Sequence, residues 1–220
     1  MRYYISDTHF FHENLNFRMD NRGFADVEAM NAHMIRQWNS RVRKKDEVVV
    51  LGDFSFGKSK ETEEILKQLN GRKCLVEGNH DYYLSDKSFD RELFLWVKPY
   101  AEMHDEGRKV VLSHYPIICY NGQFHRDNRG NPRTYMLYGH VHNSYDEVLV
   151  NRFIGEMGEV PRPLHGCDHE VVTPCQMINC FCMFSDYVPL TLTEWIEVDR
   201  KRRETLTKMG YETLKMTKEE

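Results

Sequence analysis

The alternation of short apolar runs with amphipathic segments is the feature that most constrains how this chain folds. In the first eighty residues, the apolar runs have the length of buried strands and lie at 3–5, 47–51 and 73–76. Between them, Asp26 is placed to cap a helix whose apolar residues recur every three or four positions up to Val42, and a second such segment covers about 60–70. This order, with right-handed crossovers, predicts a largely parallel sheet.

The second half of the chain follows a different pattern. Strands are expected at 97–103, 108–112, 134–138 and 177–184. The first two are expected to form a hairpin through residues 104–107. Thr191 and Glu194 have the spacing of a capping box before a final amphipathic helix. Because no repeat or linker divides the chain, we predict an α/β (α+β) protein with one domain over residues 1–220.

Side chains that bind metals follow five of the predicted strands, at the point where each strand ends. They are Asp7 and His9, Asp53, Asn79 and His80, His114, and His140 and His142. Residues i and i+2 of an extended segment point to the same side, so Asp7 with His9, and His140 with His142, can each converge. Open α/β sheets place their ligand sites at the carboxyl ends of strands. The sequence therefore predicts a metal site built from all five turns.

The number and type of these donors favour two ions over one. Imidazole and carboxylate donors without thiolates suit Mn, Fe, Zn or Ni. Two ions about 3.5–4 Å apart, bridged by a carboxylate, would use the whole set and would suit displacement at phosphorus. A single-metal hydrolase, in which the remaining histidines are structural, is the alternative.

Charge and hydropathy weigh against two classes of partner, duplex nucleic acid and membranes, although the charge balance leaves room for a local basic groove. The chain has 30 Lys and Arg against 34 Asp and Glu, a formal charge of -4, which gives no electrostatic reason to expect binding to duplex nucleic acid. No apolar run approaches the ~20 residues that cross a bilayer, and the first residues do not have the pattern of a secretory signal. We therefore expect a cytoplasmic protein without a membrane partner, whose six cysteines are reduced.

The ordered motifs resemble those of the calcineurin-like metallophosphoesterases over residues 2 to about 145. The matching motifs are Asp7-x-His9, Gly52-Asp53, Gly78-Asn79-His80-Asp81, Ser113-His114 and Gly139-His140-x-His142. The stretch from Ser6 to Asn14 is also similar to the opening motif of small bacterial and phage members. The resemblance implies a two-sheet sandwich flanked by helices, with the metals at the sheet edges.

The resemblance also implies a role for each matching residue. One metal would be held by Asp7, His9, Asp53 and His142, and the second by Asp53, Asn79, His114 and His140. His80 is implied as the general acid, and Asp81 as the residue that orients its imidazole. The implied cofactors are two divalent ions, with manganese the first expectation and Fe, Zn or Ni the alternatives.

Five further residues are candidates for substrate contacts. His12 and Asn14 follow the first ligand turn. His125, Arg126 and Arg129 lie in the long loop between two ligand turns, so that their side chains are candidates to hold a substrate phosphate. The alternative is that this loop is a solvated, charged segment.

The resemblance is weakest at about 143–175, and we interpret residues 147–175 as an insert in the domain. This insert contains His165, Cys167, His169 and Cys175. Because the spacing lacks a C-x-x-C pair, a structural zinc site is not favoured there.

The expected activity is that of a metal-dependent phosphoesterase. It would hydrolyse a phosphomonoester or phosphodiester by attack of a water or hydroxide activated on a binuclear metal centre, with His80 as the acid. The expected partner is a phosphorylated small molecule or nucleotide. A nuclease or a cyclic-nucleotide phosphodiesterase would use the same ligands. A catalytically silent binding protein is a further alternative, although every expected ligand position is filled. The sequence does not predict an oligomeric state.

Overall fold

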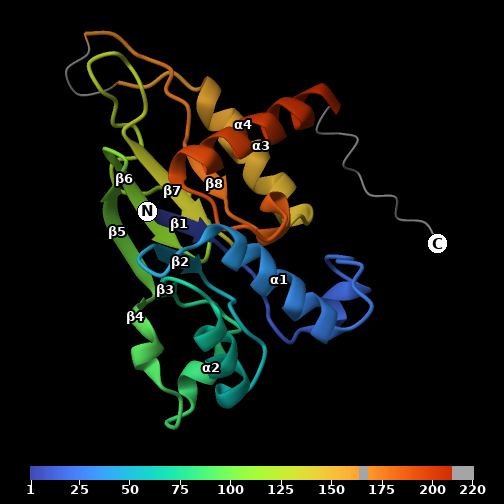
Figure 1. Cartoon of the computed structure of the whole chain (residues 1–220). Coiled ribbons are helices and arrows are strands. Elements are labelled where there is room, and N and C mark those ends of the chain that lie inside the picture. Colours follow the sequence, from blue (N-terminus) through green and yellow to red (C-terminus); the bar gives the residue numbers. More distant parts are fainter. Residues whose placement is uncertain (164–167, 210–220) are drawn as a thin grey trace.

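Two four-stranded sheets form the centre of the molecule (Figure 1). The computed structural model describes residues 1–163 and 168–209. The first sheet is parallel throughout, in the order β1 (Arg2–Ile5), β2 (Glu47–Leu51), β3 (Arg72–Val76) and β4 (Phe94–Lys98). The second contains β5 (Tyr100–Asp105), β6 (Arg108–Ser113), β7 (Thr134–Tyr138) and β8 (Met177–Asn179). Only the β5–β6 pair of this second sheet is antiparallel.

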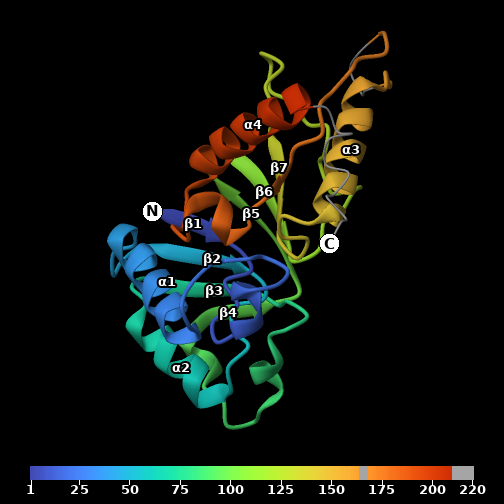
Figure 2. The same ribbon diagram turned by 90° about the vertical axis from the view of Figure 1, so that its right-hand side faces the viewer.

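The helices cover the outer faces of the two sheets (Figure 2). Helices α1 (Val27–Arg41) and α2 (Ser59–Gln68) lie on the first sheet, whereas α3 (Tyr145–Glu159) and α4 (Leu192–Met209) lie on the side of the second. Four short 3-10 helices complete the described structure: η1 (Glu13–Asn16), η2 (Tyr82–Ser85), η3 (Arg91–Leu93) and η4 (Cys182–Ser185). The two-sheet α/β sandwich expected from the sequence is therefore confirmed.

The core is layered as the two-residue period of the strands requires. In β1, Tyr3 and Ile5 join the cluster beneath α1, whereas Tyr4 faces the second sheet. In β6, Leu112 faces the first sheet and Val111 packs in a third cluster with α3. Strands that are buried on both faces read as continuous apolar runs, which is why 47–51 shows no alternation in the sequence.

Local sequence signals place the starts of α1 and α4 correctly, whereas the helix expected at about 60–70 ends earlier, at Gln68. The Asp26 carboxylate accepts a hydrogen bond from the Ala29 main-chain nitrogen and caps α1. The carboxylate of Glu194 accepts from the main-chain nitrogen of Thr191, and the Thr191 hydroxyl accepts from the main-chain nitrogen of Glu194, as a capping box requires. Trp195, buried one residue later, donates its indole N–H to the carbonyl of Tyr4 at 2.8 Å, which attaches α4 to β1.

Three sequence predictions are wrong in detail. The strand expected at 97–103 is two strands in different sheets, because the chain leaves β4 at Lys98 and enters β5 at Tyr100. The hairpin turn is shorter than 104–107, since Asp105 still pairs with Arg108. The strand expected at 177–184 ends at Asn179, and the chain then turns into η4.

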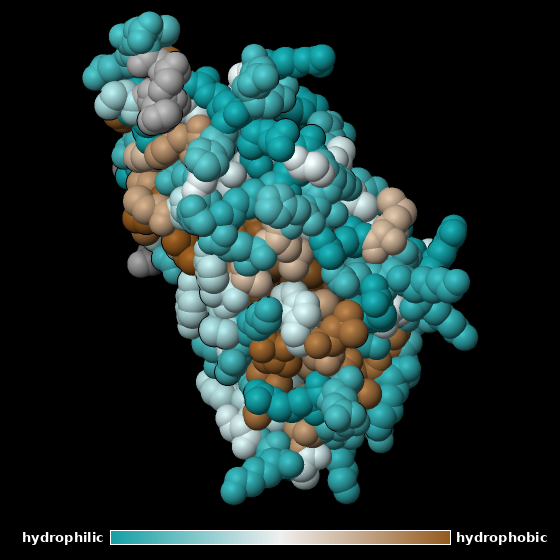
Figure 3. Space-filling view, turned by 90° about the vertical axis from the view of Figure 1, so that its left-hand side faces the viewer, coloured by the Kyte–Doolittle hydropathy of each residue, from teal (hydrophilic) through white to brown (hydrophobic). Residues whose placement is uncertain are grey.

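The edge strands β4 and β5 lie on the same side of the molecule (Figure 1). Leu95 of β4 and Tyr100 of β5 are exposed, and the view of this side shows apolar patches among polar side chains (Figure 3). The single residue between the two strands, Pro99, has no N–H to donate to a ladder. The change of sheet therefore coincides with a residue that cannot continue the pairing.

The region expected to be an insert, 147–175, lies in the connection between the parallel strands β7 and β8. Most of α3 belongs to it. His165 and Cys167 lie outside the described residues. Cys175 is buried and accepts a hydrogen bond from the Gln123 amide. In residues 1–163 and 168–209, no helix has the length and hydropathy of a membrane span.

Candidate metal centre

The candidate ligands follow the carboxyl ends of β1, β2, β3, β6 and β7, where the two sheets meet. Five of them have main-chain φ angles between 48° and 70°, in the left-handed region: Asp7, His9, Asp53, His140 and His142. Such a conformation costs about 1–3 kcal/mol for each non-glycine residue, so surrounding interactions must hold it. Five of the ten non-glycine residues with positive φ in the described part of the chain are thus candidate ligands.

Glycines allow these turns to pack closely against one another. Gly52 has a φ of 87°, and a Cβ there would overlap the His114 imidazole. A Cβ at Gly78 would overlap the main-chain nitrogen and the carboxylate of Asp53. A Cβ at Gly139 would overlap the Asp7 carboxylate. The glycines of the motifs are therefore required by close approach between the turns.

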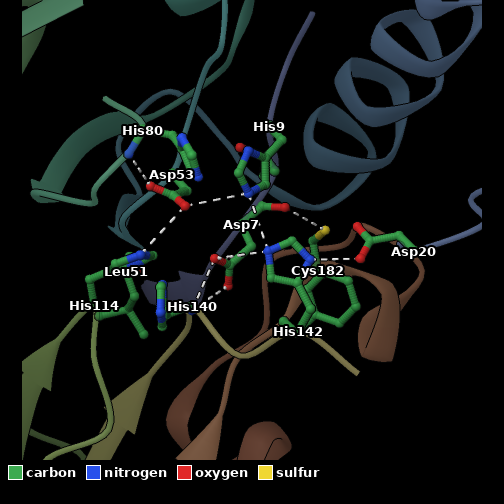
Figure 4. A network of polar contacts seen from close by, with 12 residues as sticks. Asp7, His9, Asp20, Leu51, Asp53, His80, His114, His140, His142 and Cys182 are labelled. Carbon is green, nitrogen blue, oxygen red and sulfur yellow. Dashed lines mark hydrogen bonds and ion pairs between the residues drawn. The ribbon is translucent and has the colours of Figure 1, made fainter. Parts of the chain in front are cut away.

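The structure brings six of the seven predicted ligands into two groups (Figure 4). The first group contains Asp7, His9 and His142, and the second contains Asp53, His114 and His140. Within each group the donor atoms lie within 4.8 Å of one another. The seventh residue, Asn79, joins the second group, because its Oδ1 lies 2.9 Å from His114 Nε2.

Asp53 lies between the two groups. Its Oδ2 is 3.5 Å from His9 Nε2 and also 3.5 Å from His114 Nε2. Its Oδ1 accepts a hydrogen bond from the His80 main-chain nitrogen at 2.8 Å. Burial alone would raise the pKa of Asp53, but the hydrogen bond and charge of His114 outweigh it and hold the pKa of this carboxyl below its usual value. The geometry therefore fits a carboxylate shared between two cations.

Hydrogen bonds at Nδ1 direct the Nε2 lone pairs of two histidines into the site. His114 Nδ1 lies 2.8 Å from the carbonyl of Leu51, which can only accept. His142 Nδ1 lies 2.7 Å from the carboxylate of Asp20. In both rings Nδ1 holds a proton, so Nε2 is the nitrogen that can bind a metal, as metal-ligating histidines require. Burial alone would lower the pKa of His114, but the hydrogen bond and charge of Asp53 raise it to about 9, so without a metal Nε2 also holds a proton that a bound ion would displace.

Asp20 and Arg22 belong to the site but do not follow a predicted strand. Arg22 is buried, and its guanidinium donates to the carbonyls of Asp7 and Thr8 and pairs with Asp20. Burial opposes the charge of Asp20, but the hydrogen bond from His142 and the nearby Arg22 keep the pKa of this carboxyl low. No local pattern in the sequence marks either residue as part of the site.

The donor set fits divalent cations. His9 Nε2 and His142 Nε2 face each other at 3.2 Å, and two nitrogens at that distance need a proton or a cation between them. Burial and neighbouring imidazoles hold the pKa of His9 well below its usual value, so this ring is a neutral donor. Two carboxylates and four imidazoles in two groups match the ligand preferences of Mn, Fe, Zn or Ni.

The structure corrects the role expected of Asp81. Its two carboxylate oxygens accept hydrogen bonds from the main-chain nitrogens of Asp53, Phe54 and Gly78 at 2.8–3.0 Å. His80 Nδ1, in contrast, is buried without a hydrogen-bond partner among the described residues. Asp81 therefore does not orient the His80 imidazole. It fixes the turns that carry Asp53 and Asn79, because its own side chain points back into the main chain.

Of the five expected substrate contacts, His12 and Asn14 follow the first ligand turn. His12 lies beside the site, with its ring centroid 5.4 Å from that of His9. Asn14 is exposed in η1, and no side-chain contact to the ligand groups is found for it among the described residues.

His125, Arg126 and Arg129 do not border the site, contrary to the expectation. The carbonyl of His125 accepts from the Arg133 main-chain nitrogen, and the carbonyl of Arg133 accepts from Lys109 at the start of β6. This places the loop at the amino end of the parallel pair β6–β7, about 13 Å of strand away from His140. The three residues line a separate pocket of about 580 Å³ together with Asp127, Asn128 and Arg133.

Comparison with known proteins finds one matching family model and several similar sequences. Residues 2–173 match the calcineurin-like phosphoesterase superfamily domain. An uncharacterised protein of Methanocaldococcus jannaschii is 35% identical over 148 residues, which are 66% of this chain and 72% of that protein. The glycerophosphodiester phosphodiesterase GpdQ of Enterobacter lignolyticus is 38% identical over 82 residues, which are 36% of this chain and 28% of that protein.

A solved structure supports the fold over nearly the whole chain. The crystal structure of a protein of unknown function from Aquifex aeolicus covers 90% of this chain and 98% of its own, with a TM-score of 0.54 and 25% identity. The family match extends across both sheets up to the segment before β8 and includes all the candidate ligands. The chain therefore belongs to the calcineurin-like phosphoesterase superfamily.

Proposed function

We propose that this protein is a phosphoesterase that hydrolyses a phosphomonoester or phosphodiester at a binuclear metal centre. The observation that carries the proposal is the position of Asp53 Oδ2, which lies equally far from a histidine of each ligand group. Asp7, His9, Asp53 and His142 would hold one ion, and Asp53, Asn79, His114 and His140 the other. When bound, two divalent ions polarise phosphoryl oxygens and lower the pKa of water to near neutrality.

The protein's own contribution is to hold the ligands in place before substrate arrives. Leu51 and Asp20 fix the tautomers of His114 and His142. The His140 main-chain nitrogen donates to the Asp7 carboxylate, which ties the two sheets together at the site. Ligands that are already oriented need little rearrangement, and this is the main source of electrostatic catalysis.

His80 is proposed as the general acid that protonates the leaving alkoxide. Its main-chain nitrogen is bound to Asp53, so the residue is anchored to the shared carboxylate. Its ring centroid lies 5.6 Å from that of His9, beside the ligand groups and outside both of them. A histidine in this position can deliver a proton without giving up a role as a metal ligand.

The ester type is tested by a panel of phosphomonoesters, phosphodiesters and cyclic nucleotides, assayed with Mn²⁺, Ni²⁺ and Mg²⁺. Hydrolysis of any of these esters, dependent on metal and lost on chelation, is the expected result. A chain that binds two ions and hydrolyses no ester would be a binding protein, and the proposal would be wrong. Full activity with one ion per chain would instead support the single-metal alternative.

A phosphodiesterase is favoured within this proposal. The partial similarity to a glycerophosphodiester phosphodiesterase supports a diester as the first substrate to test. The buried Arg22 is committed to main-chain carbonyls and Asp20, so it is not available to neutralise the second charge of a monoester. A nuclease acting on a short single strand would use the same site, and an oligonucleotide in the panel distinguishes it.

A further inference from the structure

Three aromatic rings lie together beside His80 and form what we call the aromatic rim: His12, Phe56 and Tyr82. The rings of His12 and Phe56 are stacked, with centroids 4.1 Å apart and planes 15° from parallel. Tyr82 meets Phe56 edge to face at 6.4 Å. Single exposed apolar side chains are common on protein surfaces. A contiguous group of rings beside candidate catalytic residues is different, because it offers a continuous surface to a ligand.

The rim is both open to solvent and fixed in position. Phe56 is 44% exposed and Tyr82 is 64% exposed. The main-chain nitrogen of Phe56 donates to the carbonyl of Phe10, and that of Tyr82 donates to the carbonyl of His80. Rings on a fixed main chain lose little conformational entropy when a ligand covers them. The rim is therefore organised for binding before a ligand arrives.

The position of His80 shows which part of a substrate would reach the rim. The centroid of the His80 ring lies 5.3 Å from that of Phe56 and 5.7 Å from that of Tyr82. A general acid gives its proton to the oxygen of the leaving group, so the leaving group must lie on the side of His80. This step rests on the proposed function. It follows that the leaving group, and not the rest of the ester, lies against the rim.

Tyr115 lies on the other side of the metal site. It is 48% exposed, and its ring centroid lies 4.5 Å from that of His140 and 5.1 Å from that of His114. The two exposed aromatic surfaces therefore border different ligand groups. Tyr115 is placed to meet the part of the ester that stays on phosphorus, which gives the site two distinguishable sides.

We propose that the aromatic rim binds a planar ring in the leaving group, so that the preferred substrates are phosphodiesters of an aromatic or nucleoside-like alcohol. Stacking of a base or aryl ring on aromatic side chains suits such a group and tolerates different rings, because every ring has a π-face. The rim carries no Lys or Arg, so it is suited to a neutral ring and not to a second phosphate.

The test compares two diesters that differ only in the ring of the leaving group, benzyl methyl phosphate and ethyl methyl phosphate. Both alcohols are primary, so the chemistry at phosphorus is nearly the same. We expect Phe56→Ala and Tyr82→Ala to lower kcat/KM for the benzyl ester by about 5- to 100-fold, mostly through KM, as the loss of one stacking contact predicts. The ethyl ester should change by less than about 3-fold. Leu149→Ala, a truncation of an exposed apolar residue on α3, should change neither.

A binding measurement separates this inference from the proposed activity. Calorimetry with the unreactive analogues benzyl(methyl)phosphinate and ethyl(methyl)phosphinate, which contain no P–O–C bond, should show on metal-loaded protein that wild type prefers the benzyl compound and that both rim variants lose the preference. Equal loss of affinity for the two analogues, or no loss for either, would overturn the inference even if the enzyme hydrolyses diesters. If no ester is hydrolysed but the preference is present, the proposed function fails and the rim remains a ring-binding site.

Discussion

Replacing Asp20 with asparagine tests how the site holds one of its two ligand groups. The carboxylate accepts a hydrogen bond from His142 Nδ1 at 2.7 Å, and its side chain is 2% exposed. In the variant the amide oxygen can still accept, but the negative charge that strengthens the bond is gone. Loss of such an outer partner typically weakens metal binding by about 10- to 100-fold, which is about 1.4–2.8 kcal/mol.

The same substitution also removes the carboxylate that faces the buried Arg22. Breaking a fully buried pair costs about 3–5 kcal/mol. Arg22 keeps its hydrogen bonds to the carbonyls of Thr8 and Asp7, at 2.7 and 2.9 Å, so we expect a smaller loss of about 1–3 kcal/mol in the free energy of unfolding. Denaturant titration of the metal-free protein measures this loss separately from metal affinity.

The decisive assay is calorimetric titration of both sites with Mn²⁺. Asp20 touches His142, which belongs to the first ligand group only, so one of the two binding steps should weaken and the other should stay within about 3-fold. Asp146→Asn, the same chemical change at an exposed position on α3, is the matched control and should alter neither step. Equal weakening of both steps, or none, would show that the ligand groups are not separate as described.

Three further predictions concern the remaining parts of the site. His80→Ala should lower kcat by about 10²- to 10⁴-fold on esters with poor leaving groups while metal content by elemental analysis stays constant, and unchanged turnover would refute its role as the acid. Gly78→Ala should push Asp53 out of place, because its Cβ would overlap that residue. A loss of about 1–3 kcal/mol by denaturant titration is expected, with weaker binding of both ions, whereas Gly107→Ala, whose Cβ meets nothing within 4 Å, should leave metal binding unchanged. Mn²⁺ at 100 times the Kd of each site should stabilise the protein by about 2.7 kcal/mol per site, or about 5.4 kcal/mol for two sites, in thermal unfolding, and Asp53→Asn should abolish that shift.

The first half of the fold was predictable because its signals are local. An N-cap such as Asp26 and a run such as 47–51 act over a few residues, and the structure places both as expected. The sheet that a strand joins depends on pairing between distant segments. For this reason the division of 97–103 between two sheets could not be read from its apolar pattern, although Pro99 lies at the point of change.

The candidate ligands could be predicted from their chemistry. The residues that hold them in place, such as Asp20, could not be predicted from the sequence. Core packing gives no reason for Asp, Asn and His to follow five of the strands, so residue type alone points to a metal. Asp20 is 122 residues away from His142, and nothing in the sequence connects the two. The prediction that the loop around Arg126 borders the site was wrong for a topological reason. A connection between two parallel strands must return to the amino end of the sheet, so the later residues of this loop lie far from the ligand turns.

The two buried charged residues Asp81 and Arg22 perform the same task, each at a turn that carries one of the two ligand groups. Asp81 accepts from three main-chain nitrogens around Asp53, and Arg22 donates to the carbonyls of Asp7 and Thr8. Both therefore hold main-chain turns whose left-handed residues would otherwise relax. A charged residue beside a metal motif looks like a ligand or an acid in the sequence. Here the charge serves the main chain, because the hydrogen bonds of Asp81 and Arg22 help to offset the strain at Asp53 and Asp7.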